Sequence, residues 1–275
     1  MKTIIVPTDF SPVSINAVNF ATDMALAIDA SILLFNVYNI PVSYSEVPFV
    51  LISVEEIKKE SEIQLEDLKK KVIHITSDKV KVNTKSTMGN TVDELEELCK
   101  EIQPFAVVMG AKGVSGIEKV MFGSTTLTAI RHITWPVICV PPGRQYGKGI
   151  KKIGFACDFK QVAETTPVLF IKQMVKEFDA ELHILNVDYK EKHFRPETPE
   201  QSFWLHKLLE DVKPQYHYIN KKDVEDGINE FAENNNLDLV IAIPKKHTLL
   251  EGIFKPSSTK KLVFQSHIPV MCVHE

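Results

Sequence analysis

Residues 4–10 of this chain read IIVPTDF, and a similar segment, IGFACDF, recurs at residues 153–159. The next apolar segment also recurs, because SILLFNV at residues 31–37 matches ELHILNV at residues 181–187. Both pairs are about 150 positions apart, and similar segments at a constant separation indicate a repeated structural unit. The chain therefore consists of two related halves.

Each half ends on another matching segment, PVICV at residues 136–140 and PVMCV at residues 269–273. These two segments are only 133 positions apart, so about 17 residues of the first half have no counterpart in the second. We expect the extra residues to lie in 38–53, where several prolines and serines predict an irregular segment.

The two halves are joined by residues 141–149, which read PPGRQYGKG and have the composition of a linker. A chain of 275 residues is long enough for two domains of ordinary size. We place the boundary near residue 145, with one domain at 1–143 and a second at 150–275.

Short apolar runs alternate with amphipathic stretches of helical period in the first half. Ser11-Pro12 is typical of a helix start, with a hydroxyl N-cap and proline in the first turn. The expected strands carry Val and Ile on both faces, which is typical of parallel strands covered on each side. We therefore predict an α/β fold of two tandem doubly wound, Rossmann-like domains, each with a five-stranded parallel sheet flanked by helices. In the first half, strands are expected at 2–7, 31–37, 79–87, 105–110 and 136–140, and helices near 12–29, 54–75, 91–102 and 124–132.

The composition excludes several classes of function. The formal net charge of −4 provides no positive field for nucleic acid or anionic lipid, so neither a nucleic-acid nor a membrane partner is expected. The four cysteines and the histidines show no metal-type spacing, so no metal site built from side chains is expected. No apolar segment is long enough to cross a bilayer, and we expect a cytoplasmic protein with free thiols.

A glycine-containing segment follows the apolar run at residues 105–109. GAKG occupies residues 110–113, and GST follows at residues 123–125. Glycine lets the backbone approach a ligand closely, and a helix N-terminus offers unpaired N–H groups to an anion. The segment is thus a candidate phosphate site, although such glycines also serve ordinary turns. It is neither a P-loop nor a GxGxxG fingerprint.

The other end of the candidate site follows from the expected topology. In open parallel sheets, ligands bind beyond the carboxyl ends of the strands, where the winding direction reverses. If the fourth strand lies beside the first, Gly110 faces residues 7–9 across that crevice. Asp9 and the backbone around Val37 would then bind a base and ribose, while the glycine segment binds phosphates.

Some of these residues have purely structural alternatives. Asp9 could simply cap its turn, because Asp158 occupies the same place in a half that lacks the glycines. Ser124 and Thr125 could cap a helix without any phosphate. Capping and binding are compatible roles.

The combination of VPTDFS at residues 6–11, the spacing G-x2-G-x9-G-S and PVICV at residues 136–140 resembles the universal stress protein family. Both halves carry the layout, so the chain is similar to tandem, two-domain members. The resemblance implies ATP or a related adenine nucleotide in the first half, with Mg²⁺ or Mn²⁺ held by the phosphates. The residues it implicates are Pro7, Thr8, Asp9, Val37, Met109, Gly110, Lys112, Gly113, Gly123, Ser124 and Thr125.

The second half has lost the glycine pattern. Ile243, Lys246 and Pro256 stand at the positions of the three glycines. A β-branched side chain hinders close approach of a ligand, and proline has no N–H donor. We expect one nucleotide per chain, bound in residues 1–143. The loss of the glycines from a half with the same layout also suggests that folding does not require them.

The leading functional hypothesis is a stress-response sensor whose ATP occupancy changes its conformation or assembly. No carboxylate or histidine is obviously placed to activate water, so rapid catalysis is not expected. Two alternatives stay open. One is a slow ATPase or another nucleotide-dependent enzyme, assisted by Asp9 or a residue from 38–53. The other is an interaction scaffold that binds no nucleotide.

The last segments of the two halves, residues 136–140 and 269–273, predict a specific assembly. Both are apolar and would be sheet edges that need covering. In the family that the chain resembles, the corresponding strands meet across a two-fold axis. We therefore expect the halves to pair within one chain as a pseudo-dimer, with association of two chains as a further option.

Overall fold

The computed structural model describes residues 1–39, 53–111, 124–189, 196–244, 261–263 and 265–274. Strands and helices alternate along both halves. The first half contains β1 (Lys2–Pro7), α1 (Pro12–Ile28), β2 (Ala30–Tyr38), α2 (Val54–Ile75), β3 (Val82–Met88), α3 (Thr91–Ile102), β4 (Ala106–Gly110), α4 (Ser124–His132) and β5 (Val137–Val140). The second half contains β6 (Lys152–Ala156), α5 (Val162–Thr165), α6 (Val168–Phe178), β7 (Glu181–Val187), α7 (Thr198–Leu209), a 3₁₀ turn (Glu210–Val212), β8 (Gln215–Ile219), α8 (Val224–Asn234), β9 (Leu239–Ala242) and β10 (Val270–Cys272).

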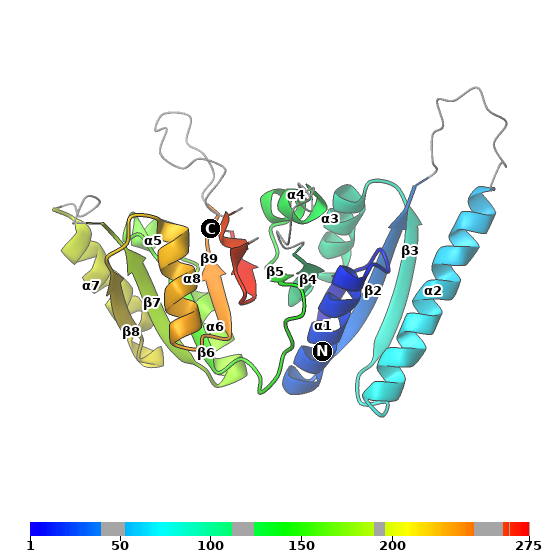
Figure 1. The fold of residues 1–275 in the computed structure, drawn as a ribbon, viewed down its shortest axis with the longest axis horizontal. Coiled ribbons are helices and arrows are strands. Elements are labelled where there is room, and N and C mark those ends of the chain that lie inside the picture. The colour runs from blue at the N-terminus through cyan, green and yellow to red at the C-terminus, as the bar shows by residue number, and fades with distance from the viewer. Residues whose placement is uncertain (40–52, 112–123, 190–195, 245–260, 264, 275) are drawn as a thin grey trace, which may run out of the picture.

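All of these strands form one ten-stranded sheet, with the order β3-β2-β1-β4-β5-β10-β9-β6-β7-β8. Every pair within a half is parallel, so each half is the predicted doubly wound α/β domain with five parallel strands. The two halves lie side by side and meet at β5 and the C-terminal strand in the middle of the molecule (Figure 1).

The junction between the halves is an antiparallel strand pair. β10 runs antiparallel to β5, with Val270 opposite Cys139 and Cys272 opposite Val137. Each of these strands would otherwise be an edge with unpaired backbone groups and apolar side chains, so their pairing covers both edges at once. The chain thus contains the expected intramolecular pairing of its two halves.

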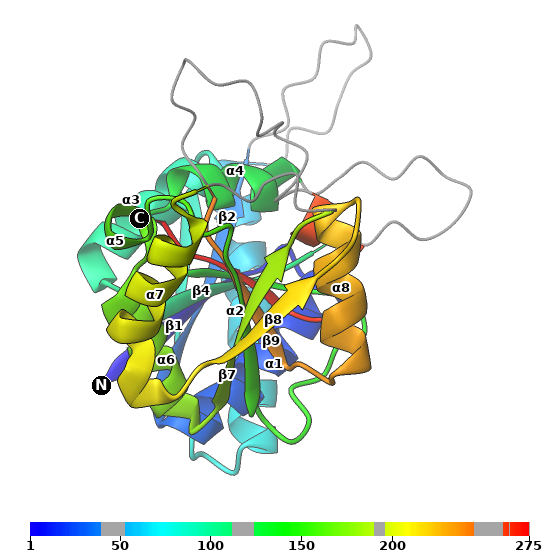
Figure 2. The same ribbon diagram turned by 90° about the vertical axis from the view of Figure 1, so that its left-hand side faces the viewer.

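The sheet is covered on both faces, and both layers of core run through the two halves. Ile4 and Val6 belong to a cluster of buried side chains on one face, together with residues of α1, α2, α6 and α7. Ile5 belongs to a cluster on the other face, with residues of α3, α4 and α8. Viewed from the end of the second half, α7 and α8 lie on opposite sides of β7 and β8 (Figure 2). Each cluster includes residues of both halves, so each layer of the core is shared between the two halves.

The helix starts follow from local capping. The side chain of Ser11 accepts a hydrogen bond from the N–H of Ser14, and Pro12 opens α1, as predicted. Ser53 and Glu56 form a reciprocal capping box at the start of α2. After α2, Ser77 and Asp78 adopt left-handed φ angles of 49° and 60°. That turn delays β3, which begins at Val82 and not at residue 79.

The residues missing from the second half are only partly where the sequence predicted them. The helix α2 has 22 residues, whereas its counterpart α7 has 12. Much of the difference is therefore a shortened helix, which still buries Leu205 and Leu209 against the sheet. Most of the predicted irregular segment, residues 40–52, lies outside the described residues.

The first helix of each half differs in a way that bears on function. In the first half α1 is continuous over 17 residues. In the second half Thr166 is extended, with φ −99° and ψ 117°, and Pro167 follows it. Proline disfavours a helical residue before it and cannot continue the hydrogen-bond ladder. The counterpart of α1 is accordingly broken into α5 and α6.

Side chains also join the two halves. Nζ of Lys2 in β1 lies 2.5 Å from Oε1 of Glu177 in α6. Nε2 of His274, next to β10, is hydrogen-bonded to the carbonyl oxygen of Ile130 in α4 over 2.7 Å. Asp238 of the second half also contacts the linker, because its Oδ1 lies 3.9 Å from Nη2 of Arg144. The orientation of the halves is thus fixed by more than the strand pair.

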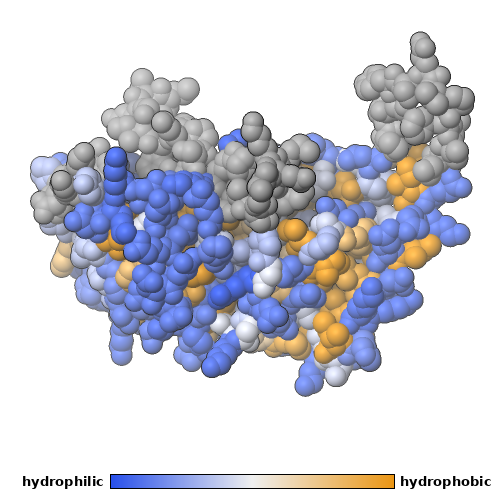
Figure 3. Space-filling model, viewed as in Figure 1, coloured by the Kyte–Doolittle hydropathy of each residue, from blue (hydrophilic) through white to orange (hydrophobic). Residues whose placement is uncertain are grey.

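Apolar residues gather on one flank of the surface. In the view of Figure 3 they lie over α1 and α2 of the first half, whereas the surface over α8 is mainly hydrophilic. Exposed apolar side chains of these helices include Leu26, Ile63 and Ile75. This surface lies along the flank of the sheet and not at the carboxyl ends of its strands, so it is not part of the site described below.

Candidate functional site

The carboxyl ends of β1 and β4 lie side by side, because Ile4 is opposite Ala106 and Ile5 is opposite Val107. On its other side β1 pairs with β2, so the winding direction reverses between β1 and β4. Such a reversal leaves a crevice at the carboxyl ends, where ligands bind in open α/β sheets. The predicted neighbourhood of the first and fourth strands is confirmed, and it places the turn after β1 beside Gly110.

The turn after β1 is held by its own hydrogen bonds. The N–H of Thr8 donates to the carbonyl of Phe35 over 2.8 Å, and the N–H of Phe10 donates to Oγ1 of Thr8 over 3.0 Å. The Thr8 hydroxyl is buried and lies 3.0 Å from the hydroxyl of Ser14 in α1. Phe10 has a left-handed φ of 61°. The chain therefore reverses within a few residues and leaves Asp9 exposed at the crevice.

The Asp9 carboxylate accepts hydrogen bonds within this turn. Its Oδ1 accepts the backbone N–H of Ser11 over 3.1 Å. Partial burial raises the pKa of Asp9, but hydrogen bonds from the side chains of Ser11 and Ser14 and from backbone N–H groups outweigh it and leave the pKa below its ordinary value. Asp9 is therefore charged at neutral pH. A charged carboxylate accepts hydrogen bonds from hydroxyl groups and repels phosphate, which suits the sugar end of a nucleotide site.

The turn is also supported by the buried side-chain amide of Asn36, which was not predicted as a candidate residue. Nδ2 of Asn36 in β2 donates to the carbonyl of Thr8 over 2.7 Å, and its Oδ1 accepts the hydroxyl of Ser61 in α2 over 2.6 Å. The Ser61 hydroxyl also lies 2.6 Å from that of Ser86 in β3. The repeat could have identified this residue, because an asparagine, Asn186, occupies the same place in the second half.

Gly110 is the last residue of β4 and packs directly against the start of α1. A Cβ atom at this position would lie 2.6 Å from both Cγ1 and the carbonyl oxygen of Val13. The carbonyl of Gly110 accepts the hydroxyl of Thr126 in α4 over 3.2 Å. Gly110 thus joins the two helices beside the crevice. The inference that folding does not require the glycines is wrong for this one, because the helix backbone leaves no space for a side chain.

The second half builds the same turn from the corresponding residues. The N–H of Lys160 donates to Oδ1 of Asp158 over 3.1 Å, and Nδ2 of Asn186 donates to the carbonyl of Cys157 over 2.9 Å. Phe159 repeats the left-handed φ, at 53°. The turn therefore belongs to the scaffold of both halves, which supports a structural role for Asp9 in addition to any contact with a ligand.

Both halves of the chain also match one protein family. The universal stress protein family matches residues 1–141 and again residues 149–274. The chain belongs to the universal stress protein family. Because two copies of the family domain lie in one polypeptide, it is a tandem member.

Individual relatives agree with this assignment. A universal stress protein of Methanocaldococcus jannaschii is 31% identical over 148 residues, which are 50% of this chain and 81% of that protein. The crystal structure of a universal stress protein from Archaeoglobus fulgidus has a TM-score of 0.76 and 18% identity, covering 99% of this chain and 98% of the other. The second similarity extends over both halves and shows that the fold is shared.

The described candidate site residues lie at the carboxyl ends of β1, β2 and β4 and in the first turn of α4. Val37 is the penultimate residue of β2, and Ser124 and Thr125 begin α4 with exposed side chains. Pro7 ends β1 with a buried side chain. Met109 is 6% exposed, so its side chain is not available to a ligand. Lys112, Gly113 and Gly123 lie outside the described residues, and the ligand-binding roles of all the candidate residues stay predictions.

Within the described ranges, no three His, Cys, Asp or Glu side chains are grouped so that they could hold a metal ion. Over the same part of the chain, no helix is long and apolar enough to cross a membrane.

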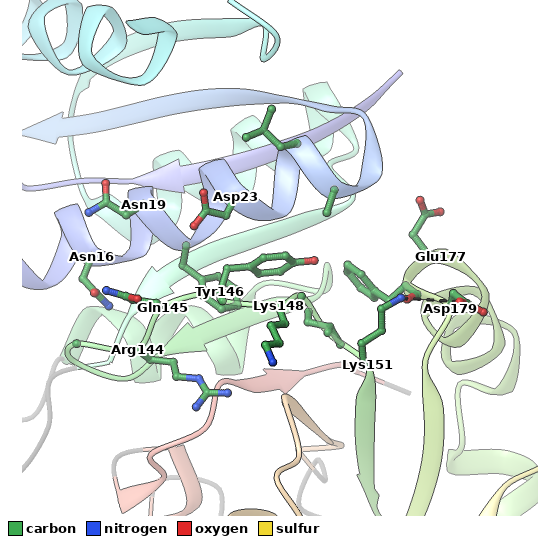
Figure 4. Close-up of a pocket in the computed structure, with 18 residues that line it drawn as sticks. Asn16, Asn19, Asp23, Arg144, Gln145, Tyr146, Lys148, Lys151, Glu177 and Asp179 are labelled. Carbon is green, nitrogen blue, oxygen red and sulfur yellow. Dashed lines mark hydrogen bonds and ion pairs between the residues drawn. The ribbon is translucent and has the colours of Figure 1, made fainter. Parts of the chain in front are cut away.

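A separate cleft of about 990 Å³ lies where the halves meet, between α1, the linker and the end of α6 (Figure 4). Its charged side chains come from both halves and include Asp23, Arg144 and Lys148. Positive and negative groups are spread around the wall. Lys151 and Asp179 lie just before β6 and β7, so this cleft is beside the amino-terminal ends of those strands. It is distinct from the crevice between β1 and β4.

Proposed function

We propose that the first half binds ATP or a related adenine nucleotide in the crevice between β1 and β4. The glycine segment leaves β4 at this crevice, and the motif ends at Ser124 and Thr125, where α4 begins. Backbone N–H groups at a helix N-terminus suit the phosphates, and the charged carboxylate of Asp9 suits the ribose. The proposed nucleotide therefore extends from the β1 turn to the start of α4.

The observation that carries the proposal is the difference between two halves with the same scaffold. Both halves have the aspartate turn and the asparagine beneath it. Only the first half has the three glycines, whereas a hydroxyl pair is present in both, because Ser257 and Ser258 stand at the positions of Ser124 and Thr125. Packing against α1 accounts for Gly110, but it does not account for Gly113 and Gly123. A phosphate ligand in the first half alone accounts for these two glycines.

A divalent cation would enter this site with the nucleotide. Asp9 is the only carboxylate among the candidate residues, and a lone carboxylate is a poor site for a hard cation that takes six or more oxygen ligands. Phosphate oxygens supply what the protein does not. We propose that Mg²⁺ or Mn²⁺ is held mainly by the phosphates.

The structure provides a route by which nucleotide occupancy would reach the second half. The first turn of α4 carries the proposed phosphate contacts, and the other end of α4 is bound by His274 through the carbonyl of Ile130. His274 lies two residues after Cys272, which ends the strand pair that joins the halves. A shift of α4 on binding would therefore act on the junction, which fits a sensor that responds through conformation or assembly.

The test is ATP titration calorimetry on matched variants of the two halves. Gly113→Val should abolish ATP binding, while Lys246→Val, at the equivalent position of the second half, should leave one ATP bound per chain. Asp9→Ala should weaken ATP binding by about tenfold or more through the loss of a charged hydrogen-bond acceptor. Asp158→Ala should leave it unchanged, although the same turn is altered.

Unchanged affinity in Gly113→Val, or no affinity of the wild-type protein for any adenine nucleotide, would refute the proposal. Phosphate release that exceeds the protein concentration and disappears in Asp9→Ala would favour the ATPase alternative. A protein partner captured equally well by the wild type and Gly113→Val would favour the scaffold. Far-UV circular dichroism of each variant separates loss of binding from loss of folding.

A further inference from the structure

The second half contains a large cleft at the carboxyl ends of β6, β7 and β8. Its volume is about 1300 Å³, and described residues from seven segments line it. This is the position that the nucleotide crevice occupies in the first half, on a scaffold that lacks the glycine motif. The cleft therefore lacks the glycines on which the proposed phosphate binding of the first half depends, and we expect it to bind a different ligand.

The wall of this cleft is mainly apolar and aromatic. Leu185, Val187 and Ile219 line it from the ends of β7 and β8. Tyr218 is 67% exposed and Phe203 of α7 is 61% exposed, so both rings are accessible to a ligand. Aromatic side chains bind planar ring systems by stacking and by edge-to-face contact. The lining favours a flat aromatic ligand.

In the second half, the break in the first helix goes together with the replacement of the glycine at the end of the fourth strand. In the first half, the residue at the end of β4 must be glycine because Val13 of the continuous helix lies against it. In the second half the corresponding residue is Ile243, whose side chain lines the cleft with Thr165 and Thr166 at the helix break. Apolar and hydroxyl side chains thus lie at the place where, in the first half, the glycine segment begins and phosphate binding is proposed.

A buried carboxylate distinguishes the cleft further. Val92 at the start of α3 is 5% exposed, and Glu225 at the corresponding place in α8 is 8% exposed and lines the cleft. The residue before each of these helices is a cap, Asn90 or Asp223, so the helices start in the same way. Glu225 therefore replaces a valine at an equivalent position, and a buried carboxylate favours a cationic or N–H-donating partner.

The described side chains of the wall include more carboxylates than lysines. Four carboxylates line it (Asp158, Asp188, Asp223 and Glu225), against two lysines (Lys160 and Lys222). The lysine at position 160 lies 3.7 Å from Asp158, and Asp223 is paired with Lys261 at 2.6 Å. Among the described lining residues carboxylates outnumber lysines, so this part of the wall offers a polyphosphate no excess positive charge.

We propose that this cleft binds a phosphate-free aromatic amine, with the ring against Phe203 and Tyr218 and the ammonium or N–H group directed to Glu225. The first half would respond to nucleotide, and the second half would respond to a chemically different small molecule. The two ligands would act on one shared sheet through β9 and β10.

The experiment uses the full chain and a pair of probes that differ mainly in charge. Tryptamine carries an ammonium group on an indole side chain, and indole-3-propionate carries a carboxylate on a similar one. We expect titration calorimetry to show that tryptamine binds about tenfold or more tightly than indole-3-propionate, as a charged hydrogen bond predicts. Saturating ATP, and the variant Gly113→Val, should leave tryptamine binding in place.

Variants assign the binding to the cleft. Glu225→Gln should weaken tryptamine about tenfold and remove the preference over the acid. Glu230→Gln removes a carboxylate from the same helix that is paired with Lys221 outside the cleft, so it should change neither affinity. Tyr218→Ala, at an exposed ring, should weaken both probes without loss of folding.

Equal affinity for the two probes, no tryptamine binding by the wild type, or unchanged binding in both Glu225→Gln and Tyr218→Ala would overturn the proposal. Displacement of tryptamine by ATP at the first-half site would also overturn it, because the amine would then occupy the nucleotide crevice. The first three outcomes do not depend on whether ATP binds as proposed for the first half.

Discussion

Gly110 and Val13 touch through their backbones, since a Cβ atom on Gly110 would lie 2.6 Å from the carbonyl oxygen of Val13. The contact joins the end of β4 to the first turn of α1, which are the two elements beside the proposed nucleotide crevice. A motif glycine therefore has a packing role that is independent of any ligand. The close approach also sets how near the helix start lies to the crevice.

Gly110→Ala should destabilise the protein by about 2 kcal/mol, because backbone atoms of a helix cannot move aside as a side chain can. Urea denaturation followed by circular dichroism measures the effect. Gly154→Ala is the matched control, because its Cβ would meet the ends of two leucine side chains, at 2.8 Å from Leu237 and 3.0 Å from Leu185. A smaller loss in Gly110→Ala than in Gly154→Ala would contradict the packing role.

The fold was predictable because its signals are local and repeated. Alternating apolar runs indicate strands and helices within a few residues, and the second copy of each segment confirms the assignment. The contact of Gly110 with Val13 was not predictable in this way, because it joins positions 97 residues apart in the chain. The shortened α7 also escaped prediction, since the residue count shows that something is missing but not from which element.

Replacing Asn36 should lower the free energy of unfolding more than replacing most polar residues. It is 7% exposed, donates to the carbonyl of Thr8 over 2.7 Å and accepts the hydroxyl of Ser61 over 2.6 Å. Asn36→Ala removes the bond to the Thr8 carbonyl and leaves the buried Ser61 hydroxyl with Ser86 as its remaining partner, so we expect a loss of about 2 kcal/mol in the free energy of unfolding. ATP affinity should also fall, because the turn that presents Asp9 loses its support.

Asn186→Ala provides the comparison for that experiment. Asn186 makes the corresponding bond to Cys157 at 2.9 Å but is less buried, so its loss should cost less. It should leave ATP affinity unchanged. The expected role of Asn36 fails if the two variants lose equal stability and bind ATP equally well.

Stability should fall in mild acid because of a histidine pair in the second half. Nδ1 of His183 lies 3.0 Å from Nε2 of His217, and the two rings stack with centroids 5.2 Å apart. Burial lowers the pKa of both, and the charge of His217 lowers that of His183 further, against an opposing effect of Glu181. The unfolded chain thus binds protons at pH values where the folded chain resists them.

The sign of the effect follows from this difference. Above the ordinary histidine value of 6.5 both states are neutral, and stability is lost progressively as the pH falls below it towards the lowered pKa of the folded state. The urea midpoint should be lower at about pH 5.5 than at about pH 7.5. His217→Phe should reduce the difference, whereas His267→Gln, with an 83% exposed side chain, should not. A pH dependence that His217→Phe leaves unchanged would assign it to other groups.

Residues 1–143 expressed alone should form a homodimer through β5. In the full chain β10 covers β5, with Met271 opposite Ile138, and the side chains of β5 are 1% exposed or less. Without β10, an apolar strand with unpaired N–H and C=O groups becomes a sheet edge, and a second copy of β5 is the partner most similar to β10. Light scattering coupled to size-exclusion chromatography should give twice the fragment mass. A wild-type fragment that stays monomeric at micromolar concentration would show that β5 does not need the second half to remain soluble.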